Sequence, residues 1–423
     1  MKPWRHTFLA NGVIFASGLA SGVIAARLLG AEERGHLAAI TYWPHLVAGV
    51  AAMGINEAIT IRTARTGATG TLRATTLALS LTLALVAVAA GVPLLPLLLG
   101  PSREASLAFT QIYFAVFVPL TFVAMNFLAV EQGEFNYRSF NVQRIIQAAA
   151  YPLLLLSLWL AGALTVHSAA VAVLSGTALV AIIRLWQAGA KLNVRPSLRE
   201  AKELLAQGGR LHAANVVMFL AIQVDKMALV LFSSDLQLGL YVVATTAASA
   251  TQSLVVQTYN NVMLPAVAKG GGEQESVTAI AGTLRRLAAL LFVTTALMVV
   301  ALPFLLPTIF GAEFSAAVPY AQVLAVAFAF LGLKNILIYL FRAWEINRPA
   351  IVAEGMASLI LVAGAYPVIQ TWSAIGMAVL VLVAQASSTA FLLVWFMRYT
   401  KIGMRHLAGN WRDAWTCRRR PRR

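Results

Sequence analysis

The stretch ANVVMFLAIQVDKMALVLF, from Ala214 to Phe232, decides how the rest of the chain is interpreted. Its length is close to the roughly 20 apolar residues that cross the core of a bilayer as a helix. It nevertheless contains an adjacent acid and base, Asp225 and Lys226. A charge at the centre of a membrane helix costs about 2.5–3.5 kcal/mol on insertion scales, so each of the two needs a partner or a function.

The region around this stretch, Ala214–Lys269, resembles an earlier region, Ala10–Arg65, when the two are aligned without gaps. The alignment matches two turn glycines, Gly35 and Gly239, and ends on a cation in both copies. Further identities fall on Ala10 and Ala214, Asn11 and Asn215, Phe15 and Phe219, Thr41 and Thr245, Asn56 and Asn260, and Ala64 and Ala268. Halves built alike, with the functional site between them, are common in transporters. We therefore expect an internal repeat.

The composition is that of a polytopic membrane protein. Of the 423 residues, 60% are hydrophobic and 11% are charged, and the mean hydropathy is +0.77. The net charge of +16 does not indicate nucleic-acid binding, because the cations lie in short clusters between apolar runs, as topology anchors do. The only cysteine, Cys417, excludes an intrachain disulfide and a cysteine-based metal site. We expect no cofactor and no metal.

The apolar runs predict about twelve membrane-spanning helices. The predicted spans are 8–29, 37–61, 74–99, 107–130, 140–162, 166–186, 211–233, 238–264, 284–310, 316–341, 350–370 and 376–399. Of the 32 Lys and Arg residues, 27 lie on the side of the two termini, 3 on the other side and 2 inside spans. By the positive-inside rule both termini are cytosolic.

The longest connection divides six spans from six. The predicted domains are a first bundle over 1–189, a cytosolic linker over 190–210, a second bundle over 211–401 and a basic tail over 402–423. In the linker, Ser197 and Glu200 have the spacing of a capping box, which predicts an amphipathic surface helix that ends at Gly208-Gly209. An even number of spans in each half gives both halves the same orientation. The repeat is therefore parallel, about an axis along the membrane normal.

Two short motifs resemble those of a known family. They are Arg27-Leu28-Leu29-Gly30, at the end of the first span, and Gln223-Val224-Asp225-Lys226, followed by Gly239. The chain is similar to the polysaccharide transporters, or O-antigen-translocase-like oligosaccharide flippases, of the multidrug/oligosaccharidyl-lipid/polysaccharide exporter superfamily. The resemblance implies two six-helix bundles around a central cavity. It also implies movement of a lipid-linked oligosaccharide across a bacterial cytoplasmic membrane, for surface polysaccharide synthesis.

The candidate site is a polar, partly cationic cavity between the halves. At 100° per residue, Asn215, Gln223 and Lys226 share one side of the seventh span, and Asp225 lies on its flank. The predicted substrate-binding residues are Lys226, Lys334, Asn215, Gln223, Thr245, Ser249, Gln252 and Asn260, and the predicted coupling acids are Asp225 and Glu57. Under the alternative interpretation, Asp225 and Lys226 are structural charges that satisfy neighbouring helices.

Two other functions remain open. An antiporter of organic cations would have a cavity dominated by acids, and a membrane glycosyltransferase could use the paired carboxylates Glu32 and Glu33. We expect no enzyme, since the sequence has no Walker motif and no Ser/His/Asp constellation. The expected partners are the lipid-linked oligosaccharide, other polysaccharide assembly proteins, and anionic lipids at the tail that contains Trp411, Trp415 and the run Arg418–Arg423.

Overall fold

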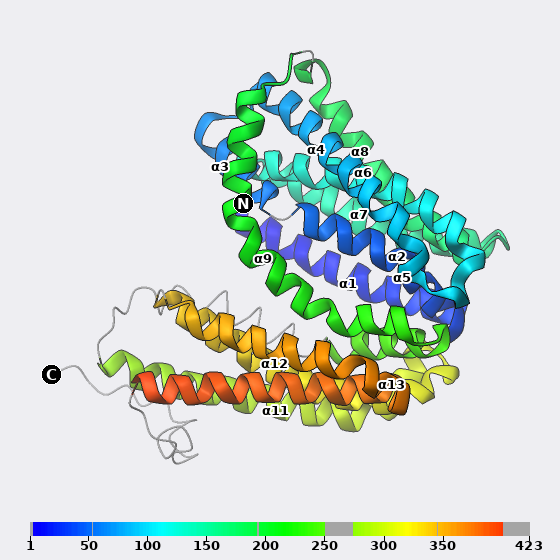
Figure 1. The fold of residues 1–423 in the computed structure, drawn as a ribbon, viewed down its shortest axis with the longest axis vertical. Coiled ribbons are helices and arrows are strands. Elements are labelled where there is room, and N and C mark those ends of the chain that lie inside the picture. Colours follow the sequence, from blue (N-terminus) through cyan, green and yellow to red (C-terminus); the bar gives the residue numbers. More distant parts are fainter. Residues whose placement is uncertain (1–2, 53, 193, 250–273, 345, 401–423) are drawn as a thin grey trace. The chain divides into compact units, whose positions relative to one another are not determined.

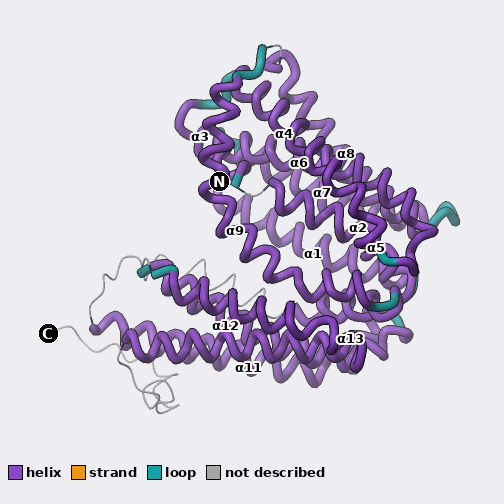
Figure 2. Tube along the Cα trace, viewed as in Figure 1, coloured by secondary structure: helices purple, strands orange, loops and turns teal. Residues whose placement is uncertain are grey.

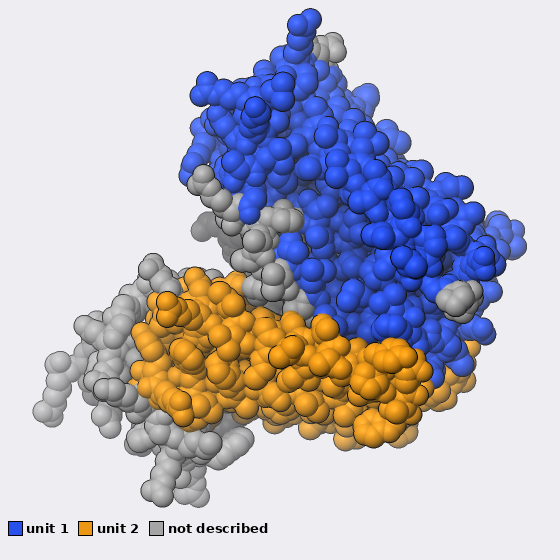
Figure 3. All heavy atoms as spheres, in the orientation of Figure 1, with its two compact units in different colours: residues 1–242 blue, residues 243–423 orange. Residues whose placement is uncertain are grey.

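A computed structural model describes residues 3–52, 54–192, 194–249, 274–344 and 346–400. Figure 2 shows helix along almost all of this chain, joined by short loops, and no strand occurs in these ranges. The chain divides into two compact units, residues 1–242 (unit 1) and 243–423 (unit 2), which Figure 3 colours separately. The predicted all-helical class is confirmed.

Figure 1 labels the longer elements of each unit. Unit 1 contains α1 (Pro3–Leu29), α2 (Ala31–Ala52), α3 (Ile55–Thr66), α4 (Gly70–Gly91), η1 (Val92–Leu94), α5 (Leu95–Leu99), η2 (Pro101–Ser106), α6 (Leu107–Gly133), α7 (Tyr137–Leu160), α8 (Val166–Ala188), η3 (Gly189–Leu192) and α9 (Leu198–Phe232). A helix over 235–249 crosses the boundary between the units. Unit 2 contains α11 (Gln274–Phe310), η4 (Ala312–Ala317), α12 (Val318–Ala343) and α13 (Arg348–Thr400).

Helix packing in each unit follows from the apolar faces of these elements. In unit 1, α1 packs along α7, and α6 packs against α3, α4 and α8. A buried cluster that includes Ile59, Leu72, Val130 and Leu204 joins α3, α4, α6 and α9. In unit 2, α12 packs between α11 and α13 around a cluster that includes Phe341. Each unit therefore has a core of its own.

Seven helices in the described ranges are long and apolar enough to cross a membrane, and α2 with α3 makes an eighth if this bent pair is one span. Two of the predicted spans, 350–370 and 376–399, both lie in α13, which is kinked where Ser373 has a φ of 57°. Helices α7 and α9 also cover predicted spans. The predicted eighth span extends beyond the described residues. A multi-pass membrane protein is therefore confirmed, whereas the count of twelve stays a prediction.

The repeat has a direct structural signature at the two aligned glycines. A Cβ placed on Gly35 would lie 1.7 Å from the carbonyl oxygen of Asp235, and one placed on Gly239 would lie 1.8 Å from that of Ala31. Ala31 and Asp235 are themselves matched by the alignment that pairs Gly35 with Gly239. Gly35 thus approaches Asp235 of the second copy, and Gly239 approaches the matching residue, Ala31, of the first copy. This is the reciprocal contact that a two-fold relation produces. Only glycine permits so close an approach of two helix backbones.

A second pair of matching turns supports the same repeat. Gly100 has a φ of 73° and precedes the 3₁₀ helix η2, and Gly311 has a φ of 121° and precedes the 3₁₀ helix η4. A positive φ is readily adopted only by glycine. In both halves the sequence before the turn is similarly rich in proline, as in Pro93–Pro96 and Pro303–Pro307.

One prediction about the linker is wrong. The side chain of Ser197 caps α9, as expected, by accepting a hydrogen bond of 3.3 Å from the backbone N–H of Glu200. The helix does not end at Gly208-Gly209, however, and Figure 1 shows α9 as one long element. A Cβ on Gly208 would lie 2.8 Å from Cδ1 of Ile55 and 3.2 Å from the backbone of Gly54. The glycine therefore allows close packing of α9 on α3, which outweighs its helix-breaking cost of about 1 kcal/mol.

Candidate functional site

A cavity of about 440 Å³ lies in unit 1 between α2, α9 and the helix that starts at residue 235. On α2 and α9 the lining positions recur every three or four residues, so each helix contributes one face. The lining residues are Arg34, Ala38, Thr41, Tyr42, His45 and Leu46 of α2, Phe219, Gln223, Lys226 and Val230 of α9, and Leu238 and Val242.

Hydrogen bonds fix the polar wall of this cavity. The hydroxyl of Tyr42 donates to the backbone oxygen of Gln223 over 2.9 Å, which ties α2 to α9. Nδ1 of His45 lies 2.7 Å from the backbone oxygen of Thr41, and the imidazole packs on the Phe117 ring with centroids 4.3 Å apart. Because Nδ1 donates to that carbonyl, Nε2 of His45 is the ring nitrogen left for a ligand.

The charged groups of the cavity lining are both cations, Arg34 of α2 and Lys226 of α9. Among the residues described, none that lines the cavity is acidic, and Lys226 forms no salt bridge. Nε of Arg34 is buried, and it has no hydrogen-bond partner among the described residues. Two cations in one cavity lining attract an anion, and the attraction is stronger where the local dielectric is low.

The predicted residues Lys226 and Gln223 thus line one cavity. Arg34 and His45, which also line it, were not among the predicted site residues. A signal was present, since Arg34, Ala38, Thr41 and His45 fall on one helical face.

Asp225, next to Lys226 on α9, is not among the residues that line the cavity. It is 7% exposed, and its Oδ2 accepts a hydrogen bond of 2.8 Å from the hydroxyl of Tyr241. Its Oδ1 is buried with no hydrogen-bond partner among the described residues. Asp225 therefore links α9 to the helix over 235–249, and its role as a coupling acid stays a prediction.

Lys334 lies in unit 2, in a buried ion pair. Its side chain is 1% exposed, and Nζ donates to Oε2 of Glu354 over 3.0 Å. Each charge of this pair therefore has its compensating partner, which a buried pair requires. Substrate binding by Lys334 stays a prediction.

The other predicted site residues are dispersed or lie outside the description. Glu57 is exposed in the first turn of α3, where an acid interacts favourably with the helix dipole. Thr245 and Ser249 are partly buried in unit 2, and Ser249 donates to the backbone oxygen of Thr246. Gln252 and Asn260, and the side chain of Asn215, lie outside the described residues.

Sequence reasoning also missed a charged cluster near the predicted outer end, which we call the outer clasp: Arg103, Asp235 and His36. Arg103, in η2, is 3% exposed, and its Nε donates to Oδ1 of Asp235 over 2.6 Å. Nδ1 of His36 lies 3.0 Å from Oδ2 of the same carboxylate, and Nε2 lies 2.7 Å from the Ser106 hydroxyl. Burial alone would raise the pKa of Asp235, but the hydrogen bonds and charges of His36 and Arg103 together lower it below its usual value.

Arg103 also holds the end of α9. Its guanidinium donates to the backbone oxygens of Val230 and Ser233, the second over 3.0 Å, and to that of Leu99 over 3.2 Å. Carbonyls in the last turn of a helix have no partner within the helix and favour a nearby cation. One side chain therefore satisfies the C-terminus of the helix that contains Lys226.

A second polar network is buried inside unit 1. Arg184 is 2% exposed in α8, and its Nε donates to Oε1 of Gln143 over 2.5 Å. Nε2 of Gln143 in turn donates to Oε1 of Glu131 over 2.6 Å. The amide thus bridges an acid on α6 and a base on α8, which ties three helices together.

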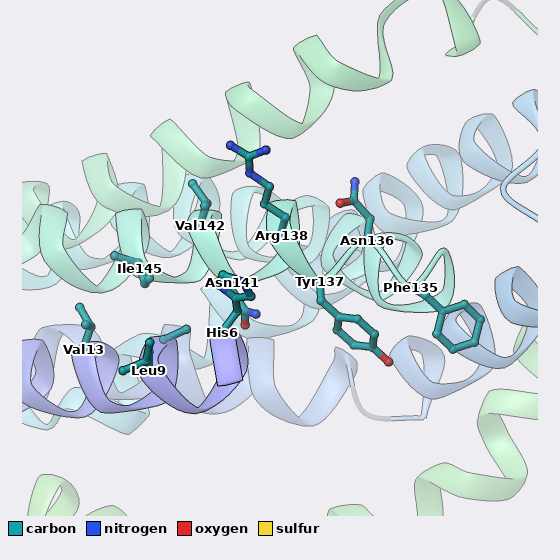
Figure 4. Close-up of a pocket in the computed structure, with 11 residues that line it drawn as sticks. His6, Leu9, Val13, Phe135, Asn136, Tyr137, Arg138, Asn141, Val142 and Ile145 are labelled. Carbon is teal, nitrogen blue, oxygen red and sulfur yellow. The ribbon is translucent and has the colours of Figure 1, made fainter. Parts of the chain in front are cut away.

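Another cavity, of about 520 Å³, lies between the beginnings of α1 and α7. Figure 4 shows Leu9 and Val13 of α1 below Ile145 of α7, with His6 and Asn141 close to one another. The amide of Asn141 donates to the hydroxyl of Thr7 over 3.0 Å. Its lining includes one guanidinium, that of Arg138, whereas the other cavity offers both Arg34 and Lys226 and is therefore the better candidate for a ligand with an anionic group.

Comparisons with known proteins were made for the sequence and for the fold. A family model described as "Polysaccharide biosynthesis protein" matches residues 24–319. The sequence matches none of the curated proteins with which it was compared.

Solved structures with a similar fold are membrane transporters. The lipid II flippase MurJ, in an inward closed conformation, has a TM-score of 0.71 at 12% identity, over 95% of this chain and 88% of that chain. An inward-facing multidrug resistance MATE family transporter of the MOP superfamily has a TM-score of 0.68 at 13% identity, over 91% and 94%. A MOP superfamily transporter from Pyrococcus furiosus has a TM-score of 0.53 at 14% identity, over 96% and 95%. The predicted transporter fold is thereby confirmed.

Proposed function

This chain belongs to the polysaccharide biosynthesis protein family, and from that premise we propose that it is a flippase for a lipid-linked oligosaccharide. The substrate is a polyprenyl diphosphate that carries a sugar. The protein moves it by alternating access from the cytosolic to the outer leaflet of a bacterial cytoplasmic membrane. The product supplies surface polysaccharide, such as the O-antigen of lipopolysaccharide.

The observation that carries this proposal is the joint presence of Arg34 and Lys226 in one cavity. A diphosphate is the fixed anionic part of such a lipid, and charge-assisted hydrogen bonds from a guanidinium and an ammonium suit its oxygens. The hydroxyl of Tyr42, the amide of Gln223 and Nε2 of His45 suit the hydroxyl groups of a sugar. The cavity thus offers groups for both parts of the substrate.

The charge of the cavity also separates the proposal from its rival. The structures with this fold include a lipid II flippase and a multidrug transporter, so the fold does not decide between an anionic lipid and an organic cation. An organic cation would be repelled by Arg34 and Lys226, and no acid among the described lining residues offsets them. Electrostatic complementarity therefore favours the anion.

Other parts of the proposal concern the surroundings of the site. Both termini are cytosolic, and the basic tail over 402–423 lies on anionic lipid head groups. The protein catalyses no reaction of its own and acts beside other polysaccharide assembly proteins. Asp225 is the acid that exchanges a proton or holds a cation during the cycle, because it is buried on α9, one of the helices that line the cavity, with one oxygen unpartnered among the described residues.

Reconstituted vesicles provide the test. A fluorescent polyprenyl-diphosphate sugar is incorporated in proteoliposomes, and its movement between leaflets is followed with an impermeant quencher. Arg34→Ala and Lys226→Ala should each slow translocation at least tenfold. A tenfold lower rate corresponds to a free-energy barrier to translocation that is higher by about 1.4 kcal/mol. Lys226→Arg, which keeps the charge, should recover part of the rate.

Lys202 provides a matched control, because it is an exposed lysine on the same helix, far along α9 from the cavity. Lys202→Ala should translocate the lipid at the parent rate. The flippase assignment is wrong if Arg34→Ala and Lys226→Ala also translocate the lipid at the parent rate. It is also wrong if these variants retain efflux of an organic cation such as ethidium while no variant moves the lipid.

A further inference from the structure

The outer clasp connects the two repeats. Arg103 and His36 belong to the first repeat, on η2 and α2, whereas Asp235 and the carbonyls of Val230 and Ser233 belong to the second. With the exception of the bonds to Leu99 and Ser106, every polar contact of the clasp therefore crosses from one repeat to the other. An internal repeat places such contacts where its halves must move apart.

Separation of the halves at this point would leave buried charge uncompensated. Arg103 is 3% exposed, and of its four acceptors only the carbonyl of Leu99 lies in its own repeat. The carboxylate of Asp235 would lose its contacts with both Arg103 and His36 at once. Breaking a buried, hydrogen-bonded ion pair is strongly unfavourable unless water replaces the lost contacts. The clasp can open only if its groups become hydrated.

The clasp lies directly beside the cavity. Arg34 and Leu238 line the cavity, and the next residue of each helix is one of the two contacting glycines, Gly35 and Gly239. The next residue on α2 after that is His36 of the clasp. Because the backbones of α2 and the helix over 235–249 touch at the glycines, no solute passes between these two helices at this level. The glycine contact and the clasp thus lie beside the cavity, at its predicted outer end.

We propose that the outer clasp is the outer gate of the transport cycle, and that the contacts of Arg103 and His36 with the second repeat break when the cavity opens outward. Arg103 is also a positioning residue, because its bonds to the end of α9 hold the helix that contributes Lys226 to the cavity. The inference rests on the proposed transport function only in that a transporter must open to the outside. It requires no particular substrate.

The test measures access to the cavity from outside. Ala38, which lines the cavity, is replaced by cysteine in a protein whose only native cysteine is removed by Cys417→Ser. An impermeant maleimide is then applied to right-side-out membrane vesicles. In the parent, the cysteine at position 38 should label slowly. Arg103→Ala and Asp235→Asn should each raise the labelling rate at least fivefold, and Arg103→Lys, which keeps the charge, should give an intermediate rate.

Glu104 supplies the matched control, since it is an exposed acid next to Arg103 that forms no part of the clasp. With Glu104→Gln added, the cysteine at position 38 should label at the same rate as in the protein without this substitution. Asp235→Asn changes the shape of the side chain very little, so it tests the gate even if Arg103→Ala fails to fold. Variants are compared only when they elute as a single species in detergent.

Three results would overturn the gate. The first is an unchanged labelling rate in Asp235→Asn, the second is an equal increase in Glu104→Gln, and the third is rapid labelling of the parent. Labelling uses no lipid-linked sugar, so a failure of the flippase assignment would leave this result unaffected. Conversely, intact lipid movement in Asp235→Asn with unchanged labelling would reject the gate and leave the flippase standing.

Discussion

The reciprocal contact of Gly35 and Gly239 gives a prediction that requires no knowledge of the substrate. Alanine at either position adds one methyl group where the backbone of the other repeat already lies. The added Cβ of Gly35→Ala would lie 1.7 Å from the carbonyl oxygen of Asp235, whereas ordinary contact begins at about twice that distance. The obstructing atom is backbone, so α2 and the helix over 235–249 must themselves move apart.

The cost follows from that displacement. Overpacking of a well-packed site usually costs about 1–3 kcal/mol, and here no side chain can rotate away, so we expect the upper end of that range. Gly12→Ala is the control, because a Cβ on Gly12 of α1 meets nothing within 4 Å. In the middle of a helix, alanine is favoured over glycine by roughly 0.5–1 kcal/mol. Gly12→Ala should therefore be neutral or stabilising.

The assay is unfolding of the purified protein in detergent, with the double variant included. Gly35→Ala and Gly239→Ala should each lower the unfolding midpoint. The double variant should cost less than the two single variants added together, because one separation of the helices relieves both clashes. If Gly35→Ala is as stable as the Gly12→Ala control, or if the two costs add fully, the glycines do not meet as described.

Four further predictions concern charged groups and topology. Lys334→Met alone should cost about 3–5 kcal/mol because it strands the carboxylate of Glu354, and adding Glu354→Leu should recover much of this loss in the same unfolding assay. Asp225→Asn should keep expression but abolish or uncouple lipid movement, and normal coupled movement would reduce Asp225 to a packing residue. The lowered pKa of Asp235 means that its ionised form stabilises the fold above the usual aspartate pKa of about 3.9, and that this contribution is lost as the pH falls through the lowered value. The stability advantage of the parent over Asp235→Asn should therefore shrink below about pH 4. Cys417 should remain unlabelled by impermeant thiol reagents in intact cells, since labelling would invert the topology.

Much of the fold could be predicted because it follows from local pattern. Apolar runs of span length predict membrane helices, and the gap-free alignment of the halves matches Gly35 with Gly239, although it does not predict that the two glycines meet. The cap at Ser197 also follows from residue spacing alone. The end of its helix does not, because Gly208 is a helix breaker by propensity and a close-packing residue against Gly54 once α3 is in place.

The site was less predictable, because its residues are selected by tertiary packing. Arg34 lies near the end of a predicted span, and the sequence does not show that it lines the same cavity as Lys226. Lys334 was predicted to bind substrate, but its pairing with Glu354 joins two helices and depends on how each is rotated. Arg103 and Asp235 lie in different short turns, which sequence spacing cannot bring together.

The backbone contacts of the two copies are symmetric, whereas the charged residues of the cavity are not, and this difference bears on the substrate. Where the backbones meet, the two copies are identical, with Gly35 matched to Gly239. Where the cavity is charged, they differ: the alignment matches Arg34 with Leu238, and Lys226 with Gly22. A site with full two-fold symmetry would offer the same groups to both ends of a ligand. A lipid diphosphate with a sugar at one end and a polyprenyl chain at the other has no such symmetry. The proposed substrate is therefore better matched by a cavity in which a symmetric backbone holds cations contributed by different positions of the two copies.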